Sequence, residues 1–291
     1  MFISGTTGVY GVIGDPVEHT LSPLMHNRAL AEMGLDAVYV PFRVKPADLE
    51  DAVEAIRALG IRGMNVTVPH KTEIISYLDS ITPEARAVGA VNTVINTGGL
   101  LEGDNTDVYG FTNCILKDGV LEQFPKRICI LGAGGAARAV VYACAVRDEV
   151  CEIAILNRTF HKAEKLADDI RGITGKKIST YPADRESQKN ILPHADMIVN
   201  TTTVGMYPLV GISPVIAGSD VFHSGQIVCD IIYNPARTKL LDDAFQHGAK
   251  TIGGMAMLAF QGARSLTLWT GLDAPVQVMI EAIKTAQREK S

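Results

Sequence analysis

The sequence predicts an α/β protein with two lobes and mainly parallel sheets. Three observations lead to this prediction. Strand and helix signals alternate along most of the 291 residues. The chain is long enough for two domains of ordinary size. A second series of strand–helix repeats begins near residue 108 and has a glycine-rich turn after its first strand.

The first lobe is predicted to begin with a strand, "VYGVIG", and a helix, "SPLMHNRALAEMG". Ser22 stands at the expected N-cap of this helix, Pro23 in its first turn and Gly34 at its end. A strand "AVYVPFRV" follows, then a helix "KPADLEDAVEAIRALG" whose apolar residues repeat at helical spacing. The remaining elements expected in this lobe are the strand "GMNVTVP", short helices near "TEIISYLDS" and "PEARAVGA", and a hairpin around "NTVINTGGLLEGDNTD", where Gly-Gly suits the turn.

The second lobe is predicted to contain "RICILGAGGAARAVVYACAV" as strand, turn and helix, then the strand "EIAILNRT" and the helix "KAEKLADDIRG". Later strands are "DMIVNTTT" and "QIVCDIIY", and the helix "KLLDDAFQHG" follows them. Two helices without strands end the chain. Because the second lobe already has its own repeats, we expect these helices to fold back onto the first. The predicted domains are residues 1–107, completed by residues 255–291, and residues 108–254.

Composition argues against several kinds of partner. The net charge is -5 and no run of Lys or Arg occurs, so we expect no nucleic-acid partner. No apolar stretch has the length of a membrane span, and no basic segment precedes an apolar one at the N-terminus, so a cytoplasmic protein without a membrane partner is expected. The five cysteines are scattered singly, and neither they nor the seven histidines have metal-ligand spacing, so no metal site is predicted. Oligomeric state is not predicted.

A glycine-rich motif, Gly132-Ala133-Gly134-Gly135-Ala136-Ala137, connects a predicted strand to a predicted helix. It fits the G-x-G-x-x-G/A pattern, in which the first Gly permits the turn and the second lets the backbone approach a pyrophosphate. The helix N-terminus offers free N–H groups to phosphates. The motif predicts a Rossmann-type dinucleotide-binding domain; the alternative is a glycine turn required only for packing.

The end of the next strand indicates which dinucleotide is bound. An NAD site typically has Asp or Glu there, whereas this chain has Asn157-Arg158-Thr159, with Lys162 four residues after Arg158. A guanidinium and an ammonium suit a 2′-phosphate, so the sequence predicts NADP rather than NAD. The alternative is that Arg158 and Lys162 are ordinary solvated charges near a helix start.

Polar side chains follow several predicted strands of the first lobe, at the points where the strands end. Open α/β sheets bind ligands at the carboxyl ends of their strands, so these side chains describe a pocket for a polyhydroxylated, negatively charged small molecule. The set comprises Thr20, Ser22, Asn65, Thr67, Lys71, Asn92, Asn105 and Asp107. Three members have a simpler interpretation, since Ser22 and Asp107 could cap helices and Lys71 could be a solvated charge.

Nine segments resemble, in the same order, the motifs of the shikimate dehydrogenase family: "GDPVEHTLSPLMHN", "GMNVTVPHK", "GAVNT", "GDNTDVYGF", "LGAGGAARA", "LNRT", "NTTTVGM", "DIIYNPARTKLL" and "GGMAMLAFQGARSLTLW". The resemblance covers nearly the whole chain. It implies the reversible NADP-linked reduction of 3-dehydroshikimate to shikimate, in the pathway to chorismate and aromatic amino acids. It also implies a first domain completed by C-terminal helices.

The resemblance assigns roles residue by residue. Lys71 and Asp107 match the family's catalytic pair. The residues that match substrate-binding positions are Thr20, Ser22, Thr67, Asn92, Asp107, Tyr233 and Gln261. The residues that match cofactor positions are Gly132, Ala133, Gly134, Gly135, Ala136, Asn157, Arg158, Thr159, Lys162, Ile231 and Gly254.

Two departures from the family pattern leave alternatives open. Thr20 stands where Ser is common, and its additional methyl group narrows the expected carboxylate pocket, so a dual shikimate/quinate dehydrogenase is the nearest alternative. Ile231 stands where Met is frequent, which keeps that position apolar. An alternative from another class is a non-catalytic NADP-binding sensor. The pair Gly253-Gly254 is interpreted either as a hinge between the lobes or as a requirement of packing.

Overall fold

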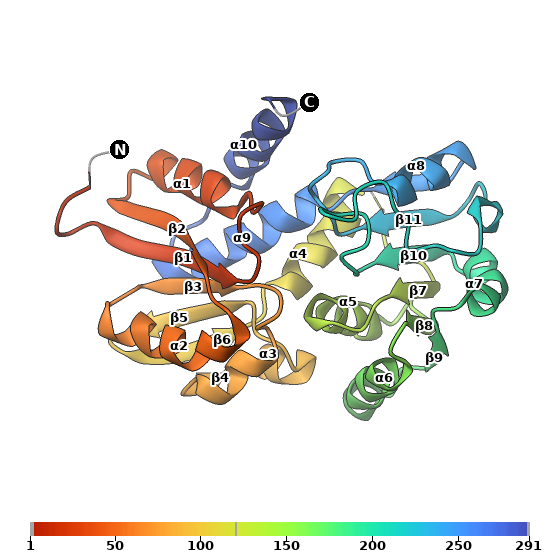
Figure 1. Cartoon of the computed structure of the whole chain (residues 1–291), viewed down its shortest axis with the longest axis horizontal. Coiled ribbons are helices and arrows are strands. Elements are labelled where there is room, and N and C mark those ends of the chain that lie inside the picture. Colours follow the sequence, from red (N-terminus) through yellow and green to blue (C-terminus); the bar gives the residue numbers. More distant parts are fainter. Residues whose placement is uncertain (1–2, 120, 290–291) are drawn as a thin grey trace. The chain divides into compact units, whose positions relative to one another are not determined.

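The structure is a computed structural model that describes residues 3–119 and 121–289 of the chain. It divides into two compact units, one formed by Met1–Gly110 with Leu258–Ser291 and the other by Phe111–Met257 (Figure 1). Each unit is built on its own six-stranded sheet. The α/β class with two lobes is therefore confirmed, whereas the assignment of one part to substrate and the other to cofactor stays a prediction.

The first unit contains a mixed sheet. Its strands, in spatial order, are β2 (Ala37–Arg43), β1 (Gly8–Gly14), β3 (Gly63–Val66), β5 (Thr93–Thr97), β6 (Leu100–Asp104) and β4 (Ser80–Ile81). Strand β1 is parallel to β2 and β3, and β4 is parallel to β6. Strand β5 is antiparallel to both of its neighbours. The predicted hairpin joins it to β6 and turns at Gly98 and Gly99, which both have positive φ.

Five α-helices accompany this sheet, namely α1 (Ser22–Glu32), α2 (Leu49–Ala58), α3 (Pro83–Val88), α9 (Met255–Thr270) and α10 (Val276–Glu289). Helix α2 buries Val53 and Ile56 in the same core cluster as Ile13 of β1. Helix α9 is fixed to the sheet by Trp269, whose Nε1 donates to the carbonyl oxygen of Val94 at 3.0 Å. A polar anchor of this kind holds α9 in one register along the sheet.

Two local predictions for this unit are wrong. Leu21 is the N-cap of α1, and Ser22 is the first residue of the helix, so Ser22 does not cap it. The segment "TEIISYLDS" was expected to be helical, but it forms only a 3₁₀ turn, η2 (Glu73–Tyr77), because Ser80 already belongs to β4. It is the second such connector along the unit, after the 3₁₀ turn η1 (Pro46–Asp48).

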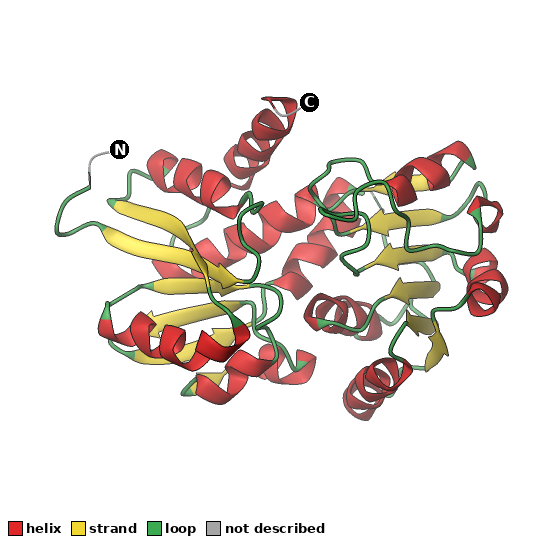
Figure 2. Cartoon of the chain, in the orientation of Figure 1, coloured by secondary structure: helices red, strands yellow, loops and turns green. Residues whose placement is uncertain are grey.

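The second unit contains a fully parallel sheet, which Figure 2 shows with helices beside it. Its strands, in spatial order, are β12 (Lys250–Ile252), β11 (Ile227–Asp230), β10 (Met197–Asn200), β7 (Arg127–Leu131), β8 (Glu152–Asn157) and β9 (Ile178–Pro182). The chain runs outward from β7 to β9 and then continues outward from β10 to β12. The strand order therefore reverses between β7 and β10, which is where Rossmann-type sheets bind dinucleotides.

The helices of the second unit are α5 (Gly135–Ala145), α6 (Phe160–Thr174), α7 (Arg185–Ile191) and α8 (Lys239–Gln246), with 3₁₀ turns η4 (Leu192–His194) and η5 (Ser219–Val221). Helix α4 (Asp107–Asn113) leads into this unit and continues as a π-helical turn, η3 (Cys114–Asp118). The sequence did not predict α7 or the edge strands β9 and β12. Edge strands are only partly buried, so their sequences lack the apolar runs that identify the central strands.

His26 of α1 is fully buried, and neither ring nitrogen has a hydrogen-bond partner within the described part of the chain. Its ring stacks on Tyr39, with centroids 4.2 Å apart. Burial lowers the pKa of His26 from 6.5 to about 3. The folded protein therefore keeps His26 neutral, whereas the unfolded chain takes up a proton below about pH 6.5. The free energy of unfolding consequently falls as the pH falls from about 6.5 toward 3.

We expect acidification from about pH 7.5 to about pH 5 to cost roughly 2 kcal/mol of stability through His26 alone. His26→Phe keeps a planar ring against Tyr39 and is expected to remove most of this pH-dependent loss. Urea unfolding followed by the fluorescence of Trp269, the single tryptophan of the chain, measures it, since its ring centroid lies 5.8 Å from that of His26. His161→Gln, at an exposed position of α6, is the control. An undiminished loss in His26→Phe would contradict this account.

Candidate functional site

Lys71 and Asp107 form a shielded ion pair in the first unit. Lys71 lies in the loop after β3, and its Nζ donates to Oδ2 of Asp107, the first residue of α4, at 2.6 Å. The two side chains are only 12% and 6% exposed. The backbone carbonyl of Lys71 accepts the N–H of Val91 at 2.7 Å, which fixes Lys71 beside the segment that carries Asn92. Lys71 is therefore not a solvated surface charge.

The second oxygen of Asp107 is also occupied. Oδ1 of Asp107 accepts from Nδ2 of Asn92 at 2.9 Å. The backbone N–H of Asp107 is bound by Oδ1 of Asn105 at 3.1 Å, so Asn105, not Asp107, serves the start of α4. The capping interpretation of Asp107 is wrong, because Asp107 is the first residue of α4 and not the residue before it. Its two oxygens accept from the side chains of Lys71 and Asn92.

Gln261 completes this cluster from the C-terminal part of the chain. It lies on α9, and its Oε1 accepts from Nδ2 of Asn92 at 3.3 Å. Asn92 itself is only 2% exposed. The structure thus brings together four residues that the resemblance places in the site, Lys71, Asn92, Asp107 and Gln261, although 190 positions separate the first from the last in numbering (261 minus 71).

Thr20, Ser22 and Thr67 lie near strand ends in the same unit. The backbone N–H of Thr67 donates to the carbonyl of Ile13 at 2.9 Å, and a Cβ at Gly14 would lie 2.4 Å from Cγ2 of Thr67. Oγ1 of Thr20 accepts the N–H of Ser22 at 3.2 Å. Within residues 3–119 and 121–289, no hydrogen bond joins these three side chains to the Lys71–Asp107 pair, so their part in a common site stays a prediction.

Sequence reasoning missed three buried hydroxyl residues beside Asn92, namely Thr93, Thr106 and Ser265. Each is at most 1% exposed, and they are hydrogen-bonded to one another. Two signals were present. Thr106 lies inside the "GDNTD" motif, and Ser265 follows Gln261 by four residues on α9, which places both on one helix face. We refer to these three residues as the hydroxyl cluster.

The glycine-rich turn of the second unit has the geometry of a phosphate site. Gly132 has φ +113°, and a Cβ there would lie 2.6 Å from Oγ1 of Thr201, so the fold itself requires this glycine. Gly134 differs, because its φ is -90° and an added Cβ would meet no atom within 4 Å. Packing does not explain Gly134, so close approach of a ligand stays the predicted reason for this glycine. Gly134 is also the N-cap of α5 and provides no side-chain cap, which leaves the first-turn N–H groups available to phosphates.

Two basic side chains, Arg158 and Lys162, flank the start of α6. Strand β8 ends at Asn157, whose Nδ2 donates to the carbonyl of Thr159, the N-cap of α6, at 2.8 Å. Arg158 and Lys162 are exposed, and within the described residues neither forms an ion pair with a carboxylate. Cations at a helix N-terminus oppose the helix dipole, and a bound anion would offset this repulsion. This charge arrangement fits the 2′-phosphate of NADP.

Ile231, Tyr233 and Gly254 lie close to one another in the second unit. Ile231 directly follows β11, and Tyr233 is two residues further along the same loop. The N–H of Gly254 donates to the carbonyl of Ile232 at 3.2 Å, and a Cβ at Gly254 would lie only 2.0 Å from the carbonyl oxygen of Ile231. Packing against this loop therefore accounts for Gly254 without a hinge.

Replacing Gly254 by alanine is expected to lower the thermal midpoint by roughly 4–10 °C, because overpacking typically costs about 1–3 kcal/mol in a unit of this size. Gly253→Ala is the matched control, since its added Cβ would have its nearest neighbour at 3.6 Å and should leave the midpoint within about 2 °C. Calorimetry of both variants makes the comparison. Equal midpoints for the two variants would show that the close contact at Gly254 is not limiting.

Asp230 is hydrogen-bonded to the loop that carries Ile231 and Tyr233. It is fully buried and accepts from Thr238 Oγ1 at 2.7 Å, Asn200 Nδ2 at 3.0 Å and the N–H of Ile232 at 3.1 Å. Burial raises the pKa of Asp230 to about 6, although these three hydrogen bonds oppose the rise. Asp230 was not predicted from the sequence, although it begins the "DIIYNPARTKLL" motif. Its role here is to hold the loop that carries Ile231 and Tyr233.

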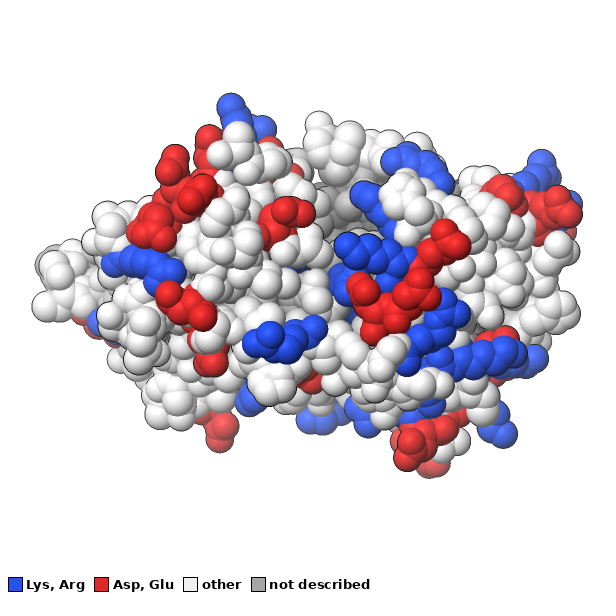
Figure 3. Space-filling view, turned by 90° about the horizontal axis from the view of Figure 1, so that it is seen from below, with Lys and Arg blue, Asp and Glu red and all other residues white. Residues whose placement is uncertain are grey.

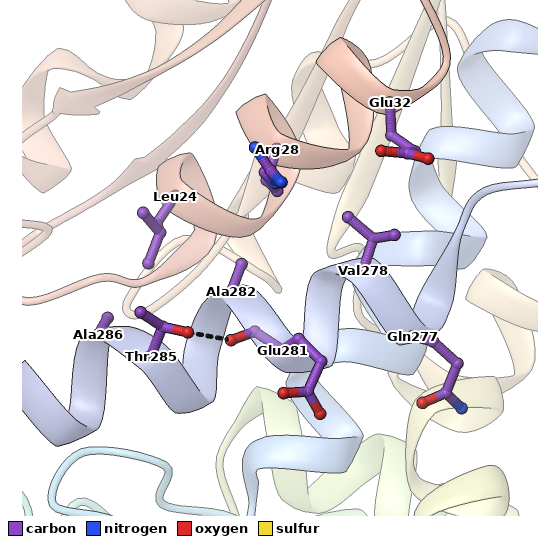
Figure 4. Close-up of a pocket in the computed structure, with 9 residues that line it drawn as sticks. All are labelled: Leu24, Arg28, Glu32, Gln277, Val278, Glu281, Ala282, Thr285 and Ala286. Atoms are coloured by element: carbon purple, nitrogen blue, oxygen red, sulfur yellow. Dashed lines mark hydrogen bonds between the residues drawn. The ribbon is translucent and has the colours of Figure 1, made fainter.

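A separate groove of about 570 Å³ lies between α1 and α10 (Figure 4). Aliphatic side chains such as Leu24 and Val278 share it with Arg28 and Glu281. None of the predicted site residues lines the groove. We therefore do not assign the reaction to it.

On the face drawn in Figure 3, basic and acidic side chains lie among one another. In the part of the chain that the structure describes, no group of three or more His, Cys, Asp or Glu side chains could hold a metal ion. Over the same residues, no helix combines the length and the apolar character needed to cross a membrane.

Comparison with known proteins identifies relatives along nearly the whole chain. Three family models match: shikimate dehydrogenase substrate binding domain over residues 12–94, shikimate/quinate 5-dehydrogenase over 118–231, and shikimate 5'-dehydrogenase C-terminal domain over 254–284. The chain is 43% identical over 281 residues to shikimate dehydrogenase (NADP(+)) of Methanopyrus kandleri, covering 97% of this chain and 96% of that protein.

Two solved structures show the same fold. One is a shikimate dehydrogenase in complex with NADP+, with TM-score 0.88, 40% identity and coverage of 98% of this chain and 97% of that one. The other is shikimate 5-dehydrogenase from Thermus thermophilus in complex with NADP(H) and shikimate, with TM-score 0.83, 35% identity and coverage of 96% and 99%.

Proposed function

The chain belongs to the shikimate dehydrogenase family, and on that premise we propose that Lys71 and Asp107 carry out the acid–base part of its reaction. The reaction is the reversible NADP-linked reduction of 3-dehydroshikimate to shikimate, in the pathway to chorismate and the aromatic amino acids. The chain is thus an oxidoreductase acting on a CH–OH group. The observation that carries the proposal is the shielded Lys71–Asp107 pair, 2.6 Å from Nζ to Oδ2.

Reduction of the ketone adds a hydride to the carbonyl carbon and a proton to its oxygen. NADPH, when bound, supplies the hydride. The Lys71 ammonium has three N–H groups, of which one is donated to Asp107. The other two remain to stabilise the negative charge that develops on the carbonyl oxygen and to deliver the proton. In the oxidation direction, the same nitrogen receives the proton of the alcohol. Asp107 orients the ammonium.

The remaining predicted residues are proposed to hold the ligands. Hydroxyl and amide groups suit the substrate's carboxylate and hydroxyls, and we assign to them Thr20, Ser22, Thr67, Asn92, Tyr233 and Gln261. The turn from Gly132 to Ala136 would hold the pyrophosphate, and Asn157, Arg158, Thr159 and Lys162 the adenosine end, with Ile231 and Gly254 beside the nicotinamide. In this proposal all the substrate residues except Tyr233 lie in the first unit, and the cofactor residues lie in the second.

Steady-state kinetics of the purified chain test the proposal. We expect NADPH to form from shikimate and NADP+, with NAD+ much less effective. A folded chain that forms no NADPH from shikimate would support the non-catalytic sensor instead. A cytoplasmic location, and the absence of nucleic-acid and membrane partners, remain predictions from composition.

Thr20 is the specific reason to test quinate alongside shikimate. Its methyl group narrows the space at the expected carboxylate position, while its hydroxyl keeps a hydrogen-bonding group there. Comparable kcat/KM values for shikimate and quinate would establish a dual dehydrogenase. A strong preference for shikimate would indicate a dehydrogenase that acts on shikimate and not on quinate.

A further inference from the structure

We propose that Ser265 is a positioning residue for this reaction, acting through the hydroxyl cluster and Asn92 on the carboxylate of Asp107. The inference rests on the proposed function and adds a residue to it. Ser265 is 0% exposed and lies on α9, one turn after Gln261. Hydrogen bonds through the hydroxyl cluster and Asn92 connect Ser265 to Asp107, and the positions of the donors and acceptors determine the direction of these bonds.

The single proton of the Ser265 hydroxyl has a fixed destination. Oγ of Ser265 donates to the backbone carbonyl of Gln261 at 3.0 Å, and a carbonyl can only accept. Its oxygen has two lone pairs, so it accepts from at most two of its three remaining neighbours. These neighbours are Thr93 Oγ1 at 2.8 Å, Thr106 Oγ1 at 3.0 Å and Asn65 Nδ2 at 3.0 Å. Thr93 has another acceptor, Oδ1 of Asn92 at 3.0 Å, so Ser265 accepts from Asn65 and Thr106.

The orientation of the Asn92 amide depends on this acceptor. Oδ1 of Asn92 accepts the backbone N–H of Thr106 at 2.7 Å, which is an obligatory donor. Nδ2 of Asn92 then donates to Oγ1 of Thr106 at 2.9 Å. The Thr106 oxygen accepts this bond, so the proton of the Thr106 hydroxyl group is donated to another acceptor. Oγ of Ser265, at 3.0 Å, is nearer to it than Oδ1 of Asn92, at 3.2 Å.

Loss of the Ser265 oxygen changes this arrangement. The Thr106 hydroxyl proton is then left with Oδ1 of Asn92 or Oγ1 of Thr93, each at 3.2 Å. Oδ1 of Asn92 already accepts the N–H of Thr106 at 2.7 Å and the hydroxyl of Thr93 at 3.0 Å, which fills its two lone pairs. Thr106, whose oxygen accepts Nδ2 of Asn92, is therefore the group whose hydrogen bonds must rearrange.

Asn92 connects the cluster to the catalytic pair. Its Nδ2 holds Oδ1 of Asp107 at 2.9 Å, while Oδ2 of Asp107 holds Lys71 at 2.6 Å. A shift of Asn92 therefore rotates the carboxylate that orients the Lys71 ammonium. Displacements of about 1 Å in such groups reduce rates by up to roughly a hundredfold, so we expect the loss of Ser265 to lower kcat.

A purely structural role for Ser265 makes a different prediction. Its bond to the carbonyl four residues earlier is an ordinary helix contact, and Thr270 makes the same contact on α9, to the carbonyl of Leu266 at 2.8 Å. In its other hydrogen bond, Oγ1 of Thr270 accepts the N–H of Leu272 at 3.2 Å. Neither bond connects Thr270 to the hydroxyl cluster or to Asn92. Thr270→Ala is therefore the matched control.

The test compares Ser265→Ala, Asn92→Ala and the double variant in the oxidation of shikimate by NADP+. We expect Ser265→Ala to lower kcat by roughly 10- to 30-fold, with KM for shikimate within about threefold of wild type and Thr270→Ala within about twofold in both. If Ser265 acts through Asn92, its effect on kcat should shrink to less than about twofold in the Asn92→Ala background. Trp269 fluorescence verifies that each variant is folded. Ser265→Cys replaces the alanine variant if that one is unfolded, because a thiol keeps the volume but is a weak hydrogen-bonding group.

The outcomes separate this inference from the proposed function. An inactive wild-type chain refutes the function. An active wild type with normal kcat in Ser265→Ala refutes only the positioning role. So does a loss that appears in KM alone, a loss that persists in the Asn92→Ala background, or an equal loss in Thr270→Ala.

Discussion

Lys71→Ala is expected to lower kcat for shikimate oxidation by roughly a hundredfold to ten-thousandfold, while KM for shikimate changes by less than about threefold. The ammonium interacts with an oxygen that is charged mainly in the transition state, so its removal affects the rate more than the binding. The structure offers no substitute in the immediate cluster, since Asn92 and Gln261 are neutral amides that cannot supply a proton at neutral pH. Steady-state kinetics with saturating NADP+ measure the effect.

Two comparisons make this result specific to Lys71. Lys45→Ala removes an exposed lysine of the same unit and should leave kcat unchanged. Lys71→Ala also leaves the buried Asp107 without its cation, so its folded state must be verified by Trp269 fluorescence. A folded Lys71→Ala variant with the kcat of wild type would eliminate Lys71 as the acid–base group.

The double variant Arg158→Ala/Lys162→Ala is expected to lower kcat/KM for NADP+ by roughly a hundredfold or more, with the value for NAD+ within about threefold of wild type. Hydrogen bonds to charged groups contribute about 1.5–3 kcal/mol each, and two of them are lost only when a 2′-phosphate is present. The ratio of the two cofactor efficiencies is the measurement.

Lys165→Ala provides the control for that experiment, because Lys165 is an exposed lysine less than one turn further along α6. It should leave the NADP+/NAD+ ratio unchanged. The same unchanged ratio in the double variant would mean that Arg158 and Lys162 are only solvated charges and that another group recognises the 2′-phosphate.

The central elements of both sheets were predictable because their sequences carry strong periodicity or long apolar runs. Strand β7, "RICIL", is buried at four of its five residues, and α2 has its buried residues at helical spacing. The edge strands of the second sheet escaped prediction for the opposite reason. Strand β12 has only three residues, one of them buried, and β9 ends in a proline.

The site was only partly predictable. Spacing alone does not pair Lys71 with Asp107, which are 36 residues apart; the family resemblance suggested the pair, and the fold brings the two side chains together. Local signals misled for Asp107 and Ser22, because a polar residue at a helix start is usually a cap, and here each is the first residue of its helix. The two sequence signals for the hydroxyl cluster did not connect its members, since Ser265 joins Thr93 and Thr106 only after α9 packs against the first sheet.

The most direct test of the account is single-turnover formation of NADPH from saturating shikimate and NADP+, measured for wild type and for Lys71→Ala. This experiment isolates the chemical step from product release. We predict rapid NADPH formation by the wild type and a rate at least about a hundredfold lower for folded Lys71→Ala. Equal rates for the two proteins, or no NADPH from the folded wild type, would contradict the account.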